Sequence, residues 1–270
     1  MEYSVLMSVY KNTDKNEFIE CVDSLKIQEP LPREIVCVID GPVDGELAAQ
    51  IEEYKKDPIF VFVPLEQNVG LGNALKEGSA HCSCEWIARM DSDDVCAPDR
   101  MKKQVAFLEE HPDVDVLGSN IAEFIGTKDN VVSERKVPAE HDAICDYLKK
   151  RCPFNHMTVF IRKSALEKAG GYLHWHYNED SYLWVRMYLA GAKFANIEEN
   201  LVFARINEAT FQRRGGYKYY QSERDLFKFM YKNKVIGYFD YLIAKTIRFV
   251  VQVLMPNRVR QWFFKTFARG

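Results

Sequence analysis

The stretch Trp86-Ile87-Ala88-Arg89-Met90-Asp91-Ser92-Asp93-Asp94 joins a short apolar run to three carboxylates. An apolar run of this length predicts a buried strand, so the acids should emerge at its carboxyl end. In open α/β sheets, ligands bind in the crevice at that end of the strands. Carboxylates one residue apart can hold a hard cation such as Mg²⁺ or Mn²⁺, whose coordination substrate phosphates usually complete. The junction therefore indicates a metal-assisted site for a phosphorylated or nucleotide substrate.

Short apolar runs alternate with helical patterns on both sides of this junction, which predicts βαβ units and a mainly parallel α/β sheet flanked by helices. Strands are expected over 4–10, 34–40, 59–64, 86–91, 115–124, 157–162 and part of 193–206, and helices over 16–28, 44–56, 70–80, 100–111 and 178–190. The composition changes near Arg214-Gly215-Gly216, after which the pattern is helical. We therefore expect a catalytic domain over 1–215, with halves 1–94 and 95–215, and a helical tail over 216–270.

The chain has 270 residues, 47% hydrophobic and 28% charged, which is a normal globular composition. Its formal net charge of −3 gives no argument for nucleic-acid binding. The seven cysteines are odd in number and lack a framework spacing, so reduced thiols in a cytoplasmic protein are expected. No stretch reaches the roughly 18 apolar residues that span a bilayer.

Two further strand ends carry candidate donor-binding groups. Asp40 closes the second predicted strand, where it could accept hydrogen bonds from a base or a ribose, although Asp-Gly is also a common turn. The second acidic strand end at Asp91 favours the binding role. The run Asn68-Val69-Gly70-Leu71-Gly72 precedes a helix and suits a phosphate, but ordinary loop geometry explains it about as well.

The second half offers polar groups whose roles the sequence leaves open. Glu179-Asp180 opens a helix, where the helix dipole alone could explain the acids, but a general base is the alternative. Asn155-His156 precedes a strand, and a lone histidine is usually a surface or packing residue. Arg213-Arg214 could neutralise a diphosphate or form a solvated charge pair.

Taken in order, these elements resemble the family 2 glycosyltransferases of bacterial surface-polysaccharide synthesis, which have the GT-A fold. The resemblance covers roughly 4–215 and is carried by the ordered set Val9-Tyr10, Asp40, Asn68-x-Gly70, Ala88-Arg89-Met90-Asp91-Ser92-Asp93-Asp94, Gly170-Gly171-Tyr172 and Glu179-Asp180-x-x-Leu183-Trp184. It implies that 1–94 binds the nucleotide and 95–215 the acceptor.

The resemblance also implies roles by position. Asp93 would be the main ligand of Mn²⁺ or Mg²⁺, Asp91 would contact the ribose or a metal-bound water, and Asp180 would deprotonate the acceptor hydroxyl in one inverting displacement. The expected donor-binding residues are Val9, Tyr10, Asp40, Asn68, Gly70, Lys76, Arg89, Asp91 and Ser92. The expected acceptor-binding residues are Asn155, His156, Glu179 and Trp184.

Three positions depart from the family pattern. Ser8 replaces a common proline, and Ala74-Leu75-Lys76 aligns with a segment that usually carries an arginine, so that Lys76 or Arg89 would have to supply its contact. A histidine often found after the last core strand is missing near 205–210. The diphosphate contact would then come from Arg213 and Arg214.

The end of the chain is basic and aromatic. Between Tyr241 and Gly270 there are six cations and no carboxylate, with Trp262 and several phenylalanines beside them. Basic amphipathic helices of this kind lie in the membrane interface, although a helix packed on the domain or a dimer contact is the alternative. We expect a peripheral protein at the inner face of the bacterial plasma membrane.

The resemblance thus implies a metal-dependent, inverting enzyme that transfers a hexose, such as glucose or galactose, from a UDP-sugar to a polyprenyl-diphosphate-linked saccharide. Two other hypotheses stay open. The first is a phosphatase of the haloacid dehalogenase type, because Asp91-x-Asp93-x-Val95 fits its nucleophile motif. The second is a non-catalytic protein that binds nucleotide sugars or scaffolds an assembly.

Overall fold

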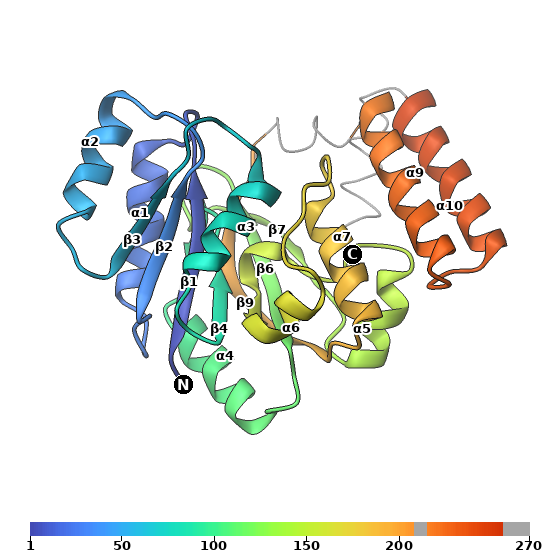
Figure 1. Ribbon diagram of the computed structural model, residues 1–270, viewed down its shortest axis with the longest axis horizontal. Coiled ribbons are helices and arrows are strands. Elements are labelled where there is room, and N and C mark those ends of the chain that lie inside the picture. Colours follow the sequence, from blue (N-terminus) through green and yellow to red (C-terminus); the bar gives the residue numbers. More distant parts are fainter. Residues whose placement is uncertain (208–214, 256–270) are drawn as a thin grey trace.

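A single mixed sheet organises the protein (Figure 1), whose computed structural model describes residues 1–207 and 215–255. Along the sheet the strands follow the order β3-β2-β1-β4-β8-β6-β9-β5, and β7 pairs with β6 outside this path. The strands are β1 (Tyr3–Val9), β2 (Glu34–Ile39), β3 (Phe60–Pro64), β4 (Trp86–Arg89), β5 (Val95–Cys96), β6 (Val116–Phe124), β7 (Val131–Arg135), β8 (Phe160–Arg162) and β9 (Phe194–Arg205).

The first four strands of the chain are parallel, as the alternating pattern predicts. β1 lies between β2 and β4, and β2 also pairs with β3 in the same direction. Their carboxyl ends therefore meet at one edge. The second half mixes directions: β8 runs antiparallel to β4 and β6, whereas β6 and β9 are parallel. This arrangement confirms the α/β fold class.

Helices cover both faces of the sheet (Figure 1). They are α1 (Lys15–Lys26), α2 (Gly45–Tyr54), α3 (Leu71–His81), α4 (Arg100–Glu110), α5 (His141–Leu148), α6 (Lys163–Lys168), α7 (Glu179–Leu189), α9 (Tyr217–Lys232) and α10 (Tyr238–Phe249), with a 3₁₀ turn at His156–Thr158 and a π turn at Val250–Leu254. Predicted helices and strands agree to within a few residues. The sequence did not predict β5, β7, α5 or α6.

Alternation along β1 divides the core into two layers. Val5 and Met7 point to the layer under α1 and α4, whereas Leu6 points to the layer under α3 and α7. α3 approaches the sheet closely, because a Cβ at Gly78 would lie 2.5 Å from Leu6 Cδ1 and 2.6 Å from Val38 Cγ2. The glycine therefore lets the second half of α3 lie directly on β1 and β2.

The predicted tail divides into two helices with different environments. α9 packs on the domain, because Leu226, Phe227 and Met230 join the same core layer as α7. α10 lies against α9, and no residue of α10 is buried. Within the described ranges, no helix is both long and apolar enough to cross a bilayer.

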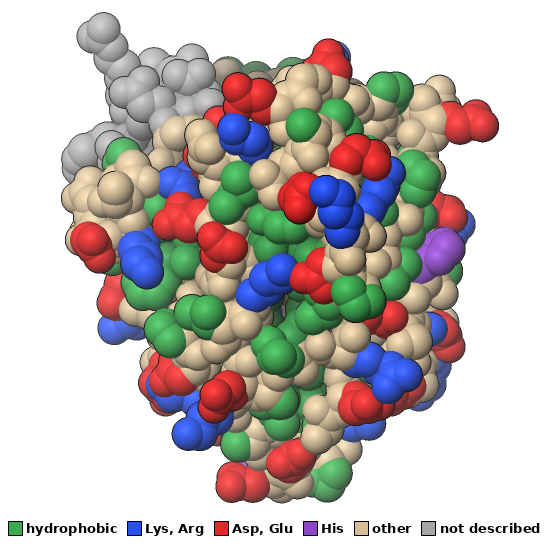
Figure 2. Space-filling model, turned by 90° about the vertical axis from the view of Figure 1, so that its left-hand side faces the viewer, with side chains coloured by type: hydrophobic (Ala, Val, Ile, Leu, Met, Phe, Trp, Pro, Cys, Tyr) green, Lys and Arg blue, Asp and Glu red, His purple; other side chains and the backbone are tan. Residues whose placement is uncertain are grey.

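Charge is mixed on the side of the molecule where α2 lies. Figure 2 shows Lys and Arg side chains interspersed there with Asp and Glu, and no large area of one sign. All seven cysteines lie in the described residues and are free thiols, as the sequence predicted.

Candidate active site

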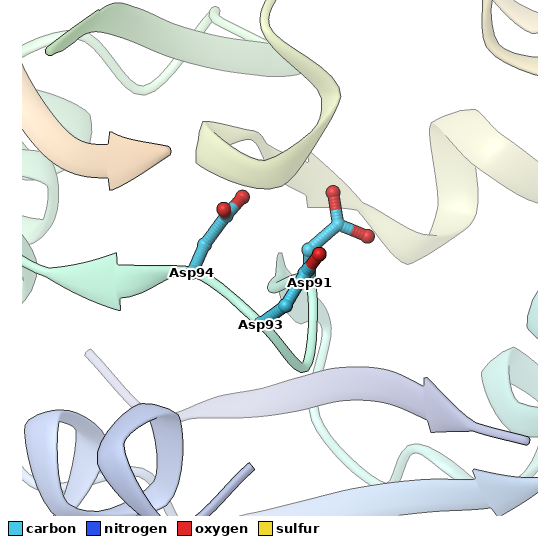
Figure 3. Close-up of side chains that lie close together, drawn as sticks. All are labelled: Asp91, Asp93 and Asp94. Carbon is cyan, nitrogen blue, oxygen red and sulfur yellow. The ribbon is translucent and has the colours of Figure 1, made fainter. Parts of the chain in front are cut away.

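The acid loop, defined here as Asp91–Asp94, connects β4 to β5 at the carboxyl edge of the sheet. Ligand oxygens of Asp91, Asp93 and Asp94 all lie within 4.8 Å of one another. Figure 3 shows the three side chains rising from this loop toward the same side. The pKa of Asp93 is raised to about 6, mainly because the protein displaces water from its carboxyl group and secondly because Asp91 lies beside it. A set of hard oxygen ligands with excess negative charge could hold a divalent cation.

Arg205, at the end of β9, holds the acid loop in place. Its backbone N–H donates to Asp94 Oδ1 at 2.8 Å, and its Nε donates to the backbone oxygen of Asp93 at 3.0 Å. The same guanidinium pairs with Glu17 and Glu20 of α1 and donates to the Gly126 backbone oxygen. Asp94 is buried, and its other oxygen, Oδ2, has no partner among the described residues. Burial, Asp91 and Asp93 raise its pKa well above the ordinary value.

Arg89 lies beneath the acid loop, on the α3 and α7 side of the sheet. Its side chain is 2% exposed, and Nη2 pairs with Asp91 Oδ1. Its Nε and Nη1 have no partner in the described part of the chain. Burial lowers the pKa of Arg89, but the neighbouring Asp91 outweighs burial, so the pKa stays above its ordinary value. A buried guanidinium of this kind neutralises part of the charge that the acids concentrate here.

Asp40 organises the loop between β3 and α3. Its two carboxylate oxygens accept from the Asn68 side chain at 2.9 Å, from Val69 N at 2.7 Å and from Gly70 N at 3.1 Å. Gly41 makes this approach possible, because its φ is +85° and a Cβ there would lie 2.6 Å from Asn68 N. Asp40 is therefore placed to shape the loop ahead of α3.

The other expected donor residues are distributed around this edge. Val9 is fully buried and accepts from Asp40 N through its backbone oxygen, whereas Tyr10 is 42% exposed at the end of β1. Ser92 is half-buried in the acid loop. Lys76 is exposed in the middle of α3, away from the amino end that faces the site. Its position gives no support to the donor contact that the sequence suggested.

Glu179 and Asp180 open α7 and point to different neighbours. Burial and then Asp180 raise the pKa of Glu179 to about 7, and the charges of Arg89 and Asp91 also act on it. Asp180 Oδ1 accepts from Ser181 N at 2.6 Å, and Cys152 Sγ donates to Oδ2 at 3.4 Å. Burial and Asp180 raise the pKa of Cys152 to about 12, so this thiol acts as a hydrogen-bond donor. The start of α7 thus faces the acid loop with one carboxyl and the 152–155 loop with the other.

The remaining acceptor candidates lie beneath this surface. Trp184 is fully buried and packs on Phe154 and His156. Its indole therefore has a packing role and does not make the contact with an acceptor that the resemblance implied. Asn155 is 1% exposed and donates to Ser119 O at 2.8 Å, which is likewise structural. His156 lies 3.2 Å from the Tyr172 hydroxyl, and burial and Arg89 lower its pKa well below the ordinary value. These three residues pack beneath the site and support the residues above them.

Sequence reasoning missed three residues that assemble the site. Asp94 was visible as the last acid of the quoted stretch, whereas Arg205 carries no local signal. Arg135, on the unpredicted β7, donates to the Cys152 and Phe154 backbone oxygens and to Asn155 Oδ1, which fixes the 152–155 loop. Arg213 and Arg214, the diphosphate candidates, lie outside the described residues.

Comparison with known proteins agrees with this geometry. The sequence profile described as Glycosyl transferase family 2 matches residues 4–169. The chain belongs to glycosyltransferase family 2. The phosphatase hypothesis is therefore set aside.

Relatives match this glycosyltransferase over nearly its whole length. An uncharacterized glycosyltransferase of Haemophilus influenzae is 40% identical over 100% of both chains. The amylovoran biosynthesis glycosyltransferase AmsE of Erwinia amylovora is 35% identical over 99% of this chain and 100% of its own. The UDP-Gal:alpha-D-GlcNAc-diphosphoundecaprenol beta-1,3-galactosyltransferase of Escherichia coli is 32% identical over 99% and 97%.

Solved structures support the GT-A fold. The crystal structure of S. aureus TarS 1-349 with UDP-GlcNAc superposes with a TM-score of 0.70 at 18% identity, covering 97% of this chain and 79% of the other. The mannosyltransferase PcManGT from Pyrobaculum calidifontis, solved with GDP-Man and Mn²⁺, gives 0.65 at 17% identity, covering 100% and 76%. At this identity the likeness concerns the fold alone.

Replacing Glu179 by Gln should stabilise the glycosyltransferase at alkaline pH. The pKa of Glu179 is about 7 in the folded state against an ordinary 4.5, so the folded state retains a proton that the unfolded chain releases between these values. The contribution of Glu179 to the free energy of unfolding therefore falls as the pH rises from about 4.5 to 7. Thermal denaturation in EDTA should show Glu179→Gln melting about 2–5 °C above wild type at pH 8, and close to it at pH 4.5.

Glu77→Gln, at an exposed position of α3, is the control and should leave the melting temperature unchanged at both pH values. An equal effect of Glu179→Gln at both pH values would contradict the raised pKa.

Proposed function

We propose that this glycosyltransferase transfers a hexose from a UDP-sugar, with inversion, to a lipid-linked saccharide in the synthesis of O-antigen, capsule or exopolysaccharide. The names of its relatives support this, because AmsE belongs to amylovoran biosynthesis and the E. coli relative is a galactosyltransferase that uses UDP-Gal and a diphosphoundecaprenol-linked sugar. Both relatives match the chain from end to end.

The observation that carries the proposal is the meeting of two acid groups at one edge of the sheet. The acid loop follows β4, and Glu179 and Asp180 open α7, yet Asp91 and Glu179 are close enough for the charge of one to raise the pKa of the other. A Cβ at Gly72, at the start of α3, would lie 3.3 Å from Glu179 Cβ, so α7 begins directly against the donor half. The acid loop could hold the donor while a carboxylate at the start of α7 receives a proton from the acceptor.

The acid loop fits a bound Mn²⁺ or Mg²⁺. Asp91, Asp93 and Asp94 would hold it, since their oxygens lie within 4.8 Å of one another and Asp94 Oδ2 is buried without a partner among the described residues. When bound, such a cation neutralises charge on the diphosphate leaving group. Arg89 holds the Asp91 carboxylate in place through their ion pair.

Asp180 would act as the base. The acceptor oxygen attacks the anomeric carbon, the bond from that carbon to the diphosphate oxygen breaks, and the hydroxyl proton passes to the Asp180 carboxylate. A single displacement inverts the configuration at the anomeric carbon. Ser181 N and Cys152 Sγ fix the carboxylate but leave lone pairs open, because an ionised carboxylate has about four acceptor positions.

Asp93→Asn should remove metal-dependent donor binding. Losing one of three carboxylates weakens the cation site, so we expect UDP-hexose with Mn²⁺ to raise the melting temperature of wild type by several degrees and that of the variant by much less. Asp44→Asn, at an exposed acid beyond β2, is the control. Equal stabilisation of wild type with and without EDTA would contradict the metal site.

Asp180→Asn should preserve donor binding and lower turnover by about two to four orders of magnitude, the usual contribution of a general base. The measurement is transfer of radiolabelled hexose to a lipid-linked saccharide, alongside the melting-temperature shift with UDP-hexose. Asp142→Asn, at the equivalent first turn of α5, should retain full activity. Near-normal turnover of Asp180→Asn would refute the base, and UDP binding without transfer by wild type to any such acceptor would favour a non-catalytic binder.

We further propose that α10 places the enzyme on the inner face of the plasma membrane. Phe239, Ile243, Ile247, Val250 and Leu254 recur every three or four residues and are 44–77% exposed, so they form one apolar stripe along α10 and the π turn. The chain beyond this turn adds Arg258, Arg260, Lys265 and Arg269 without a carboxylate. An exposed apolar stripe followed in the sequence by an excess of positive charge is suited to bind a membrane that contains anionic lipids.

Ile243→Glu combined with Ile247→Glu should reduce sedimentation with phosphatidylglycerol vesicles several-fold. The matched control is Ile27→Glu with Leu31→Glu, since these residues are 64% and 58% exposed and lie beside α1. Equal sedimentation of both double variants would exclude α10 as the contact.

A further inference from the structure

The segment between Tyr172 and α7 is rich in aromatic rings and leads directly into the two candidate acids. It reads Leu173-His174-Trp175-His176-Tyr177-Asn178. In Figure 1 the loop before α7 rises at the end of the molecule where the carboxyl ends of β1 and β2 lie. Trp175 packs on Tyr182 of α7 with their ring centres 4.3 Å apart, whereas His176 and Tyr177 are exposed. The segment is thus packed at its base and open at its tip.

Tyr177 combines an exposed ring with a costly backbone. Its φ is +66°, in the left-handed region that residues with a Cβ other than Asn and Asp rarely adopt. Its side chain is 47% exposed, so burial of the ring does not compensate for this conformation. Backbone conformations of this kind persist where the surroundings impose them, and they concentrate at ligand-binding sites.

The surroundings that impose it come from α9. Ser222 of α9 is buried, its hydroxyl donates to the His176 backbone oxygen, and it accepts from Asn178 Nδ2 at 3.0 Å and from Trp175 Nε1 at 3.1 Å. These bonds hold the chain on both sides of Tyr177. α9 therefore holds the backbone that carries Tyr177 in place.

Two exposed rings and one half-buried ring form a surface that we name the aromatic shelf: His176, Tyr177 and Tyr219. The ring centres of His176 and Tyr177 are 3.9 Å apart, and those of Tyr177 and Tyr219 are 5.6 Å apart. Tyr219 belongs to α9, so the shelf joins the loop to the helix that holds it. Its ring faces are apolar, and its hydroxyl and imidazole groups can exchange hydrogen bonds.

We propose that the aromatic shelf binds the pyranose ring of the acceptor saccharide, an inference that rests on the proposed function and assigns its acceptor subsite. Tyr177 lies three residues before Asp180 in the loop that leads into α7, and under this proposal a sugar on the shelf would present a hydroxyl to that carboxylate. A pyranose has one C–H-rich face that packs on aromatic rings and a rim of hydroxyls that bond polar groups. The adjacent Glu179 and Asp180 favour an uncharged ring over a phosphate at this place.

The test compares Tyr177→Asn with Tyr177→Phe. Asn tolerates the left-handed backbone, so this variant should keep or raise the melting temperature while it removes the ring. With UDP-hexose and N-acetylglucosaminyl diphosphate carrying a short alkyl chain, we expect the acceptor KM to rise about five- to tenfold in Tyr177→Asn, the scale of one lost aromatic contact. The KM for UDP-hexose should stay the same, and Tyr177→Phe should retain the wild-type acceptor KM.

Tyr238→Ala is the matched control, because Tyr238 is 51% exposed on α10 and pairs with Tyr231 away from the loop. It should leave both KM values unchanged. An unchanged acceptor KM in Tyr177→Asn would overturn the shelf while leaving the proposed function intact.

Binding without turnover separates the two proposals. Saturation-transfer NMR should show magnetisation passing from aromatic protons to the sugar C–H protons of the same alkyl compound in wild type, and a loss of this signal in Tyr177→Asn. If wild type transfers no hexose but the signal behaves as expected, the shelf stands and the proposed reaction falls. No signal in wild type, or an equal signal in both proteins, overturns the shelf.

Discussion

Electrostatic balance at one edge of the sheet is the constraint on which the rest of the site depends. Five carboxylates, three in the acid loop and two at the start of α7, lie around this edge, and repulsion between them grows as water is excluded. Two arginines offset it: Arg89 lies buried beneath the acid loop, and Arg205 ties the loop to α1 and β9. A buried ion costs several kcal/mol in lost hydration, so such a cluster persists only where charges are paired or a ligand completes them.

The two halves of the domain supply different parts of this balance. Parallel strands of the first half bring Asp40 and the acid loop to one edge, and Asp40 shapes the turn into α3. The second half brings α7 to the same edge and supports it from below with buried groups such as His156 and Trp184. The acid loop and the start of α7 therefore face each other, and under the proposed function one would serve the donor and the other the acceptor, as a one-step transfer between two bound substrates needs.

The helices after the domain have two different relations to it. α9 completes a core layer and fixes the loop before α7 through Ser222, so it supports the side of the site that α7 forms. α10 covers α9 and leaves an apolar stripe exposed. If α10 lies on a membrane, α9 connects that surface to the loop that carries Tyr177, and a lipid-linked acceptor would approach the site from the same side.

The sequence alone determined the order of strands and helices in the first half, the parallel sheet and the acid loop, because the hydrophobic period and the acids at strand ends are local signals. It did not determine β5 or β7, since a two-residue strand and an exposed edge strand carry little hydrophobic pattern. Only the tertiary structure decided that Asp40 bonds the 68–70 loop, that Trp184 is buried, and that Arg89, Arg135 and Arg205 assemble the site. These roles depend on contacts between residues distant in the chain, and the identity of an arginine does not say which carboxylate or carbonyl it will meet.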